Sequence, residues 1–331
     1  MATHIDAHLH LACDGDIGLQ LLAGLDLKLL NISVPQPDRE KWRARTDVFR
    51  TLARQHPNHF AWVAGFDLPT WDADGNLENG YVDRCIAEVD AELAAGAVGV
   101  KIWKNVGMEV LKPSGEYLMV DDPLYDPIYE FLAAKGTTLL LHIGEPRSCW
   151  LPLDNPEDPH YGYYSQNPQW HMYGRQDMPS HQAIIDARDR MVAGHPQLRV
   201  VGAHLASLEY DVDAVAQRLD EFPNFAVDTS ARLLDLALQE PAKVRAFVER
   251  YRDRILFGTD LVDDTPWSTL ATDTVATKGP ATQNRIATEL AWYGQDGPMQ
   301  FRDRTISGLG LGSDTLPDLL GRNAERWYPG L

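Results

Sequence analysis

The sequence contains few cysteines and no long hydrophobic run. Cys13, Cys85 and Cys149 are the only three in 331 residues, and an odd, unpatterned set argues against a disulfide framework and favours a reducing compartment. No apolar stretch approaches the length that spans a membrane. The first strand is expected to begin near Thr3, which would leave no room for a signal peptide. We therefore expect a cytoplasmic protein without a membrane partner.

Positive charge is also scarce. Lysine and arginine total 30 against 48 aspartates and glutamates, a formal net charge of −18. Such a surface repels phosphate backbones and anionic lipids, so a nucleic-acid partner is not expected. An anionic small-molecule substrate remains compatible with this charge, because a metal ion and a few basic side chains can reverse the local field.

Linkers and low-complexity segments are absent, and no glycine-rich phosphate loop follows the first apolar run, which argues against an open dinucleotide-binding sheet. Instead, apolar runs alternate with amphipathic stretches such as residues 81–95 eight times, which predicts an α/β fold, a single (β/α)8 TIM-type barrel over residues 1–331. Long loops are expected after strand 5 (145–179) and strand 8 (261–304), and short ones after the other strands. The predicted strands end near His10, Ser33, Gly65, Trp103, His142, His204, Asp228 and Asp260.

Several of these strand ends are occupied by side chains that bind metals. His8 and His10 alternate along one strand and therefore share a face, while His142, His204 and Asp260 end three later runs. A barrel directs the ends of all its strands to one mouth, so the five side chains should converge. Imidazole nitrogens with one carboxylate favour a borderline divalent ion, zinc first, with manganese, cobalt or iron as alternatives. The alternative for each histidine taken alone is an ordinary core or surface position.

Four segments resemble the amidohydrolase superfamily, specifically its amidohydrolase-related (amidohydrolase 2) branch, which includes aminocarboxymuconate-semialdehyde decarboxylase-like enzymes and lactone hydrolases. They are Ile5-Asp6-Ala7-His8-Leu9-His10, the strand-end histidines His142 and His204, Phe257-Gly258-Thr259-Asp260, and Gly321-Arg322-Asn323-Ala324-Glu325-Arg326-Trp327. The resemblance implies one metal ion held by His8, His10, His142 and Asp260. It also implies that His204 is a catalytic acid or base, or else a further ligand, and that Asp260 has a second, catalytic role as a proton shuttle.

The reaction that follows from this resemblance is attack of metal-activated water on the carbonyl of a lactone, ester or amide. The alternative is a metal-dependent, non-oxidative decarboxylase of a small aromatic or unsaturated carboxylic acid. A barrel that binds a structural metal without catalysis is a third hypothesis.

Five further residues are candidates for substrate binding. Lys101, Arg175 and Arg232 are placed to hold a carboxylate, although each also fits a plain salt bridge, and Lys101 fits a carboxylated lysine bridging a second metal. Trp170 and Tyr164 belong to an aromatic segment that suits a pocket for a flat or cyclic ligand, or alternatively a homo-oligomer interface.

Overall fold

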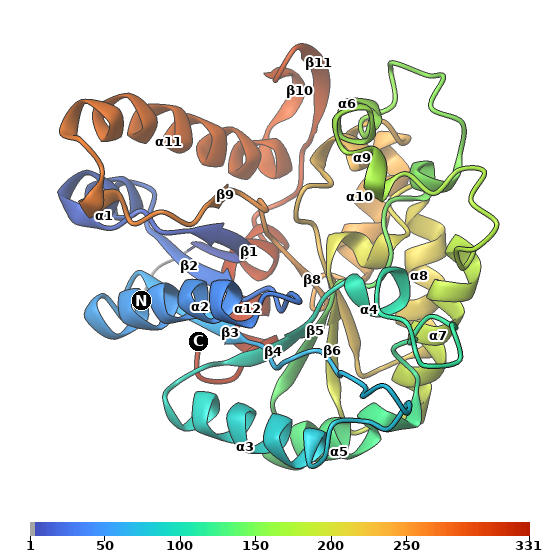
Figure 1. The fold of residues 1–331 in the computed structure, drawn as a ribbon. Coiled ribbons are helices and arrows are strands. Elements are labelled where there is room, and N and C mark those ends of the chain that lie inside the picture. The colour runs from blue at the N-terminus through green and yellow to red at the C-terminus, as the bar shows by residue number, and fades with distance from the viewer. Residues whose placement is uncertain (1–3) are drawn as a thin grey trace.

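A closed barrel of parallel strands forms the centre of the molecule (Figure 1). The computed structural model describes residues 4–331, so the expected strand start near Thr3 lies outside the described residues. The main sheet has the order β8-β7-β6-β5-β4-β3-β2-β1-β9, and its paired strands are parallel. Its strands are β1 (His4–Leu11), β2 (Leu27–Ile32), β3 (Phe60–Ala64), β4 (Gly99–Ile102), β5 (Thr138–Leu141), β6 (Arg199–Gly202), β7 (Phe225–Asp228), β8 (Ile255–Leu256) and β9 (Val262–Asp263).

Helices connect these strands and cover the outside of the barrel. They are α1 (Gly15–Gly24), α2 (Arg39–Gln55), α3 (Tyr81–Ala94), α4 (Asn105–Met108), α5 (Asp126–Lys135), α6 (Tyr161–Gln166), α7 (His181–Gly194), α8 (Val212–Glu221), α9 (Leu233–Ala237), α10 (Pro241–Arg250), α11 (Thr272–Gly294) and α12 (Asn323–Trp327). A separate antiparallel hairpin, β10 (Asp296–Phe301) and β11 (Arg304–Leu309), follows α11. The predicted (β/α)8 barrel is confirmed.

The barrel closes where the first strand meets the eighth. β8 and β9 stand at opposite ends of the sheet order but are two parts of one segment, separated only by residues 257–261. Hydrogen bonds from Ala7 N to Phe257 O (2.9 Å) and from Asp260 N to His8 O (2.8 Å) join that segment to β1. The eighth strand is thus interrupted at the position of Asp260.

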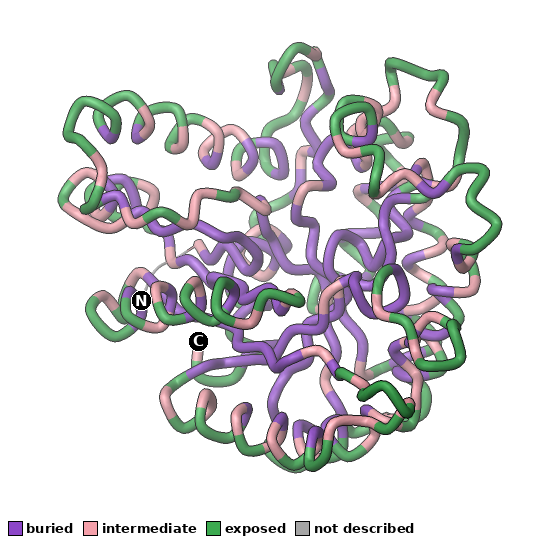
Figure 2. Tube along the Cα trace, in the orientation of Figure 1, coloured by how far each residue is buried: buried purple, intermediate pink, exposed green. Residues whose placement is uncertain are grey.

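Apolar side chains fill the barrel and the layer between strands and helices, so buried residues concentrate on the central strands (Figure 2). The inner cluster includes Ile5, Ile32 and Leu140, and Trp327 and Tyr328 pack against it from the C-terminal segment. Asn323 bonds the carbonyl oxygens of Arg252 (2.6 Å) and Ile255 (2.7 Å), which anchors α12 to β8.

The loop lengths differ from the expectation at two strands. The segments after β3 (65–80) and β4 (103–125) are long, because each contains a small turn closed by an isolated bridge, Trp71–Leu77 and Leu111–Tyr117. The loop over 145–179 is long as expected and contains α6. Most of the segment 261–304 is helix α11 and strand β10 rather than irregular loop.

Over residues 4–331, no helix has the length and apolar character needed to cross a membrane.

Candidate active site

An irregularity in β1 sets the direction of the two N-terminal histidines. Ile5 and Ala7 pack with the cluster inside the barrel, whereas Leu9 and Leu11 pack with the outer cluster beneath the helices. Strict alternation would place all four on one face. The pairing of β1 with β2 shifts register between Asp6 and Leu9, which is how a β-bulge redirects side chains. His8 and His10 consequently point to the barrel mouth.

His8, His10 and Asp260 form a candidate metal site. One ligand atom from each lies within 4.8 Å of the others, with His10 Nε2 3.5 Å and His8 Nε2 3.9 Å from Asp260 Oδ1. The other ring nitrogen of each histidine is already engaged: His8 Nδ1 lies 2.7 Å from Asp228 Oδ2, and His10 Nδ1 lies 2.7 Å from Ile32 O. Since these acceptors require protonated Nδ1 atoms, both Nε2 atoms are unprotonated and carry a lone pair, as a metal ligand must; that of His8 faces Lys101 Nζ at 3.0 Å.

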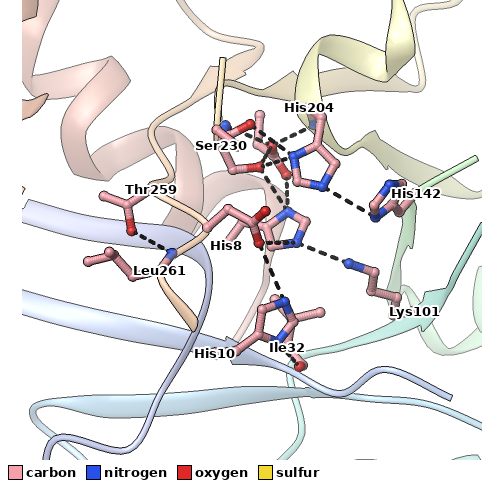
Figure 3. A network of polar contacts seen from close by, with 12 residues as sticks. His8, His10, Ile32, Lys101, His142, His204, Ser230, Thr259 and Leu261 are labelled. Carbon is pink, nitrogen blue, oxygen red and sulfur yellow. Dashed lines mark hydrogen bonds and ion pairs between the residues drawn. The ribbon is translucent and has the colours of Figure 1, made fainter. Parts of the chain in front are cut away.

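Asp228 and Ser230 hold the histidines in place, and Figure 3 shows Ser230 next to both His204 and His8. Asp228 ends β7 and also accepts hydrogen bonds from His204 N (2.9 Å), Ser230 N (3.1 Å) and the Ser230 hydroxyl. Burial disfavours its charge, but the electrostatic interaction and the hydrogen bond with His8 outweigh burial and hold the pKa of Asp228 below the usual range. The sequence reasoning missed both residues, although the strand-end rule that identified His142 also applies to Asp228.

His142 and His204 contact each other, with ring centroids 4.3 Å apart, and the His204 ring also lies 4.7 Å from the His8 ring. His204 Nδ1 lies 2.9 Å from Ser230 O, and His204 Nε2 lies 3.2 Å from His142 Nδ1. Assigning protons to satisfy this chain makes His142 Nδ1 the donor, so His142 Nε2 also keeps a lone pair. Burial lowers the pKa of both imidazoles well below the ordinary value, which keeps them neutral. The four-ligand set with His142 therefore stays a prediction, and the proton assignment is compatible with it.

The backbone around His204 is strained. Four consecutive residues, His204 to Ser207, have φ between 56° and 58°, a left-handed conformation that costs about 1–2 kcal/mol for each non-glycine residue. Hydrogen bonds hold the turn: the Arg188 guanidinium donates to Ala206 O, and Ser207 Oγ donates to Ile143 O (2.9 Å). Asp260 has φ 56° as well. Backbone strain at His204 and Asp260 is typical of a functional site, where the surrounding contacts hold residues in unfavourable conformations.

Lys101 lies at the centre of the site. Its Nζ is 3.0 Å from His8 Nε2, and burial lowers its pKa to about 8. Burial likewise lowers the pKa of His10. Burial disfavours the charge of Asp260, yet the electrostatic effect of the surrounding histidines, that of His204 first, outweighs burial and lowers the pKa of Asp260. Neutral imidazoles beside an ionised carboxylate are the donor set that a divalent cation requires.

A cavity of about 430 Å³ opens beside these residues. His142, His204 and Asp260 form part of its wall, and Tyr164 and Arg232 form another part. Tyr164 is buried, and its hydroxyl donates to Glu145 Oε2 at 3.2 Å. α11 and the β10–β11 hairpin contribute further wall residues, Arg285, Glu289, Phe301 and Arg302.

Three of the predicted substrate-binding residues, Lys101, Arg175 and Trp170, do not line this cavity. Arg175 is partly exposed and pairs with Asp177 at 3.0 Å, because its loop turns outward beyond Met172. Trp170 packs edge to face against Trp103, with ring centroids 5.6 Å apart, and lies under the Lys104 ammonium at 4.0 Å. Lys104 in turn pairs with Glu145, so Trp170 supports the cavity wall from behind.

Comparison with known proteins identifies a family. The family model described as amidohydrolase matches residues 5–330. A search of the curated proteins found no match. Among solved structures, the chain is similar to an uncharacterised TIM-barrel protein from Bordetella bronchiseptica, at 16% identity over 94% of this chain and 81% of that chain, with a TM-score of 0.53.

Two further similar structures are decarboxylases. 2,6-Dihydroxybenzoate decarboxylase from Rhizobium shares 16% identity over 99% of both chains, with a TM-score of 0.55. Dihydroxybenzoic acid decarboxylase from Polaromonas sp. JS666, with bound manganese and the inhibitor 2-nitroresorcinol, shares 15% identity over 99% of this chain and 97% of that chain, with a TM-score of 0.56. At these identities the similarity shows a common fold.

Proposed function

We propose that this chain, which belongs to the amidohydrolase family and is a metal-dependent enzyme of that superfamily, hydrolyses a lactone, ester or amide. The observation that supports this most directly is that His8, His10 and Asp260 each place one potential ligand atom within 4.8 Å of the others. These residues, with His142 as the fourth ligand, would hold one divalent ion, zinc being the first choice. When bound, the ion supplies Lewis acidity, which lowers the pKa of water and polarises a carbonyl.

The remaining steps belong to side chains of the chain itself. Asp260, ionised and 27% exposed in its side chain, accepts a proton from the attacking water and returns it to the leaving group. His204 lines the same cavity, and Ser230 O fixes its protonated Nδ1, so its Nε2 accepts a proton at the substrate and returns it in a later step. Lys101, beside His8, stabilises negative charge that develops there.

A specific observation also favours the second candidate, non-oxidative decarboxylation. Lys101 is a buried cation 3.0 Å from a metal-ligand nitrogen, and a substrate carboxylate placed at that position would gain from its charge. In that reaction the bond between carbon and carboxylate breaks, carbon dioxide leaves, and the electron pair remaining on carbon takes a proton that Asp260 or His204 first accepts from water.

The two reactions leave different products. Zinc-loaded enzyme is screened against lactones, amides and aromatic carboxylates in ¹⁸O-water, with carbon dioxide trapped from the same samples. Incorporation of ¹⁸O into a carboxylate product supports hydrolysis, and stoichiometric carbon dioxide supports decarboxylation. Activity that is unchanged after complete removal of the metal would contradict both.

The role of His204 is tested separately. We expect His204→Gln to bind one equivalent of zinc with kcat reduced by roughly 10²–10⁴-fold, because an acid or base contributes about that much. Zinc content that falls in parallel with activity would instead make His204 a ligand. His195→Gln, which changes the histidine that caps the C-terminal end of α7 and contacts Asp126, is the matched control.

A further inference from the structure

The hairpin of β10 and β11 reaches the cavity with the residues at its tip. It stands beside the segment that contains α6, where Arg304 donates a hydrogen bond to Glu157 O at 2.9 Å (Figure 1). Because Phe301 pairs with Arg304, the connecting loop consists of only Arg302 and Asp303. Phe301 and Arg302 both line the cavity described above. The tip of the hairpin is therefore part of the wall of the candidate active site.

Arg302 has a backbone conformation that favours glycine. Its φ is 55°, and it occupies the first position of a two-residue hairpin loop, where a positive φ is usually provided by glycine. A side chain at this position strains the backbone. Strain of this kind occurs mostly at active sites and ligand-binding positions, so the conformation indicates a function for the arginine side chain.

The guanidinium of Arg302 has no carboxylate partner. Arg304, two residues further along the hairpin, pairs with Glu157 at 3.5 Å. In the described residues 4–331, no carboxylate oxygen lies within 4.0 Å of the Arg302 guanidinium. Its carbon atom Cζ lies 5.4 Å from the centroid of the Phe301 ring. Since Arg302 is exposed and lines the cavity, its charge is accessible to a ligand there.

Pairing among the charged side chains of the cavity leaves a surplus of positive charge. The wall contains four basic and four acidic side chains, which are Lys104, Arg232, Arg285, Arg302, Glu145, Asp235, Asp260 and Glu289. Each acidic side chain contacts a basic group of its own, in the pairs Glu145–Lys104, Glu289–Arg285, Asp235–His160 and Asp260–His10. Within residues 4–331, Arg232 and Arg302 form no such pair. Arg232 is buried, with 7% of its surface exposed, so Arg302 presents its charge more openly.

We propose that Arg302 binds a carboxylate of the substrate that is remote from the reacting carbonyl. This inference deepens the proposed function and rests on it, because the other end of the same substrate must reach the metal ligands. A guanidinium binds a carboxylate through two parallel hydrogen bonds. Glu289, Asp303 and Asp235 act electrostatically on Arg302, which favours a singly charged carboxylate over a doubly charged phosphate. The substrate is therefore a lactone, ester or amide that carries a carboxylate at its far end.

Straight-chain acids that differ at one end test this subsite. The monocarboxylates from butyrate to octanoate and the dicarboxylates of the same chain lengths are titrated calorimetrically, at low salt, into zinc-loaded full-length enzyme. One carboxylate of either acid can bind the metal, and only a dicarboxylate offers a second one to Arg302. We expect one chain length of dicarboxylate to bind about fivefold more tightly than its monocarboxylate, because an ion pair at an exposed site contributes up to about that factor.

Two substitutions of Arg302 separate the role of its side chain from that of its backbone. Arg302→Gln removes the charge, and Arg302→Gly also relieves the left-handed conformation. Both should lower the dicarboxylate advantage to about twofold, the statistical factor for a molecule with two equivalent ends, and leave monocarboxylate affinity unchanged. Arg302→Gly should melt no lower than wild type, unlike a variant of a residue that only holds the hairpin. Arg304→Gln is the matched control and should keep the advantage, because Arg304 points to Glu157.

The results separate this inference from the proposed function. Monocarboxylate affinity that is the same with and without zinc contradicts the proposed function. Zinc-dependent binding without a dicarboxylate advantage at any length overturns only the subsite, as does an advantage that survives both substitutions of Arg302. A melting temperature of Arg302→Gly well below that of wild type would give Arg302 a structural role and also overturn the subsite. Absence of binding by every acid does the same, whereas the substrate screen for hydrolysis or decarboxylation is unaffected.

Discussion

Asp228→Asn should weaken metal binding although Asp228 is not expected to touch the metal. In the native protein Asp228 Oδ2 accepts from His8 Nδ1 at 2.7 Å, while Oδ1 accepts from the backbone N–H groups of His204 and Ser230. The asparagine oxygen will keep the two backbone bonds, because an amide nitrogen cannot accept them. The amide nitrogen then faces His8, and two donors meet.

His8 resolves this conflict by changing its tautomer. Nδ1 becomes the acceptor and the proton moves to Nε2, which is the nitrogen that points to His10 and Asp260. Binding a cation then requires His8 to abandon that tautomer, at a cost of about 1–3 kcal/mol for one broken buried hydrogen bond. Since 1.4 kcal/mol corresponds to a tenfold change, we expect zinc affinity to fall by roughly 10- to 100-fold, the range typical of such supporting contacts.

The measurement is a competition titration of zinc between the enzyme and a chelator of known affinity, with ¹⁵N spectra of the histidine rings to report the His8 tautomer. Asp67→Asn is the matched control. Asp67, in the loop after β3, is 5% exposed and pairs with Arg43 at 2.8 Å, away from the histidines. A folded Asp228→Asn variant whose zinc affinity stays within threefold of wild type would refute the reasoning.

Three further predictions concern stability. Burial raises the pKa of Glu289, which pairs with Arg285, to about 7, so the folded state binds this proton more tightly than the unfolded state does. The free energy of unfolding of wild type, measured by urea denaturation relative to Glu289→Gln, should therefore fall by roughly 3 kcal/mol between pH 4.5 and pH 8. Parallel pH profiles for the two proteins would contradict this. Gly202→Ala should destabilise by about 1–3 kcal/mol, because its Cβ would lie 2.6 Å from Ala206 Cβ; Gly194→Ala, where nothing lies within 4 Å, should melt no lower than wild type. Removal of the metal should lower the melting temperature reversibly, by the equivalent of about 4 kcal/mol at zinc a thousandfold above its Kd, and identical melting curves with chelator and with zinc would argue against the metal site.

The barrel and the place of its site could be predicted from local patterns. Apolar runs separated by amphipathic stretches define the strand order, and the rule that strand ends share one mouth is sufficient to bring His8, His10 and Asp260 together. Each of these patterns lies within a short segment of the chain, so it can be recognised without knowing which strands pair with one another.

The orientation of individual side chains depends on contacts that a linear pattern does not contain. The bulge in β1 arises from its pairing with β2. Without the bulge, strict alternation would place His8 and His10 on the outer face of the barrel wall, opposite to Ile5. Ser230 contributes through a hydroxyl between two imidazoles, for which the sequence has no signal. Arg175 was a reasonable candidate by residue type, but its loop turns it toward Asp177.

The loops were the least predictable part. The stretches 65–80 and 103–125 close on themselves through small turns, and nothing in their composition distinguishes them from shorter connections. The left-handed turn at His204 is similarly invisible, since Leu205 and Ala206 have no preference for positive φ and are held there by Arg188, whose side chain comes from α7.

The seam at which β1 meets the interrupted eighth strand has a consequence for biosynthesis. His8 and His10 leave the ribosome about 250 residues before Asp260 and the backbone around it. No nascent intermediate that lacks this segment can present the three ligand atoms together. Cation uptake therefore reports that the cylinder has closed, and its energy is released at the final step of assembly, where it opposes reopening of the seam.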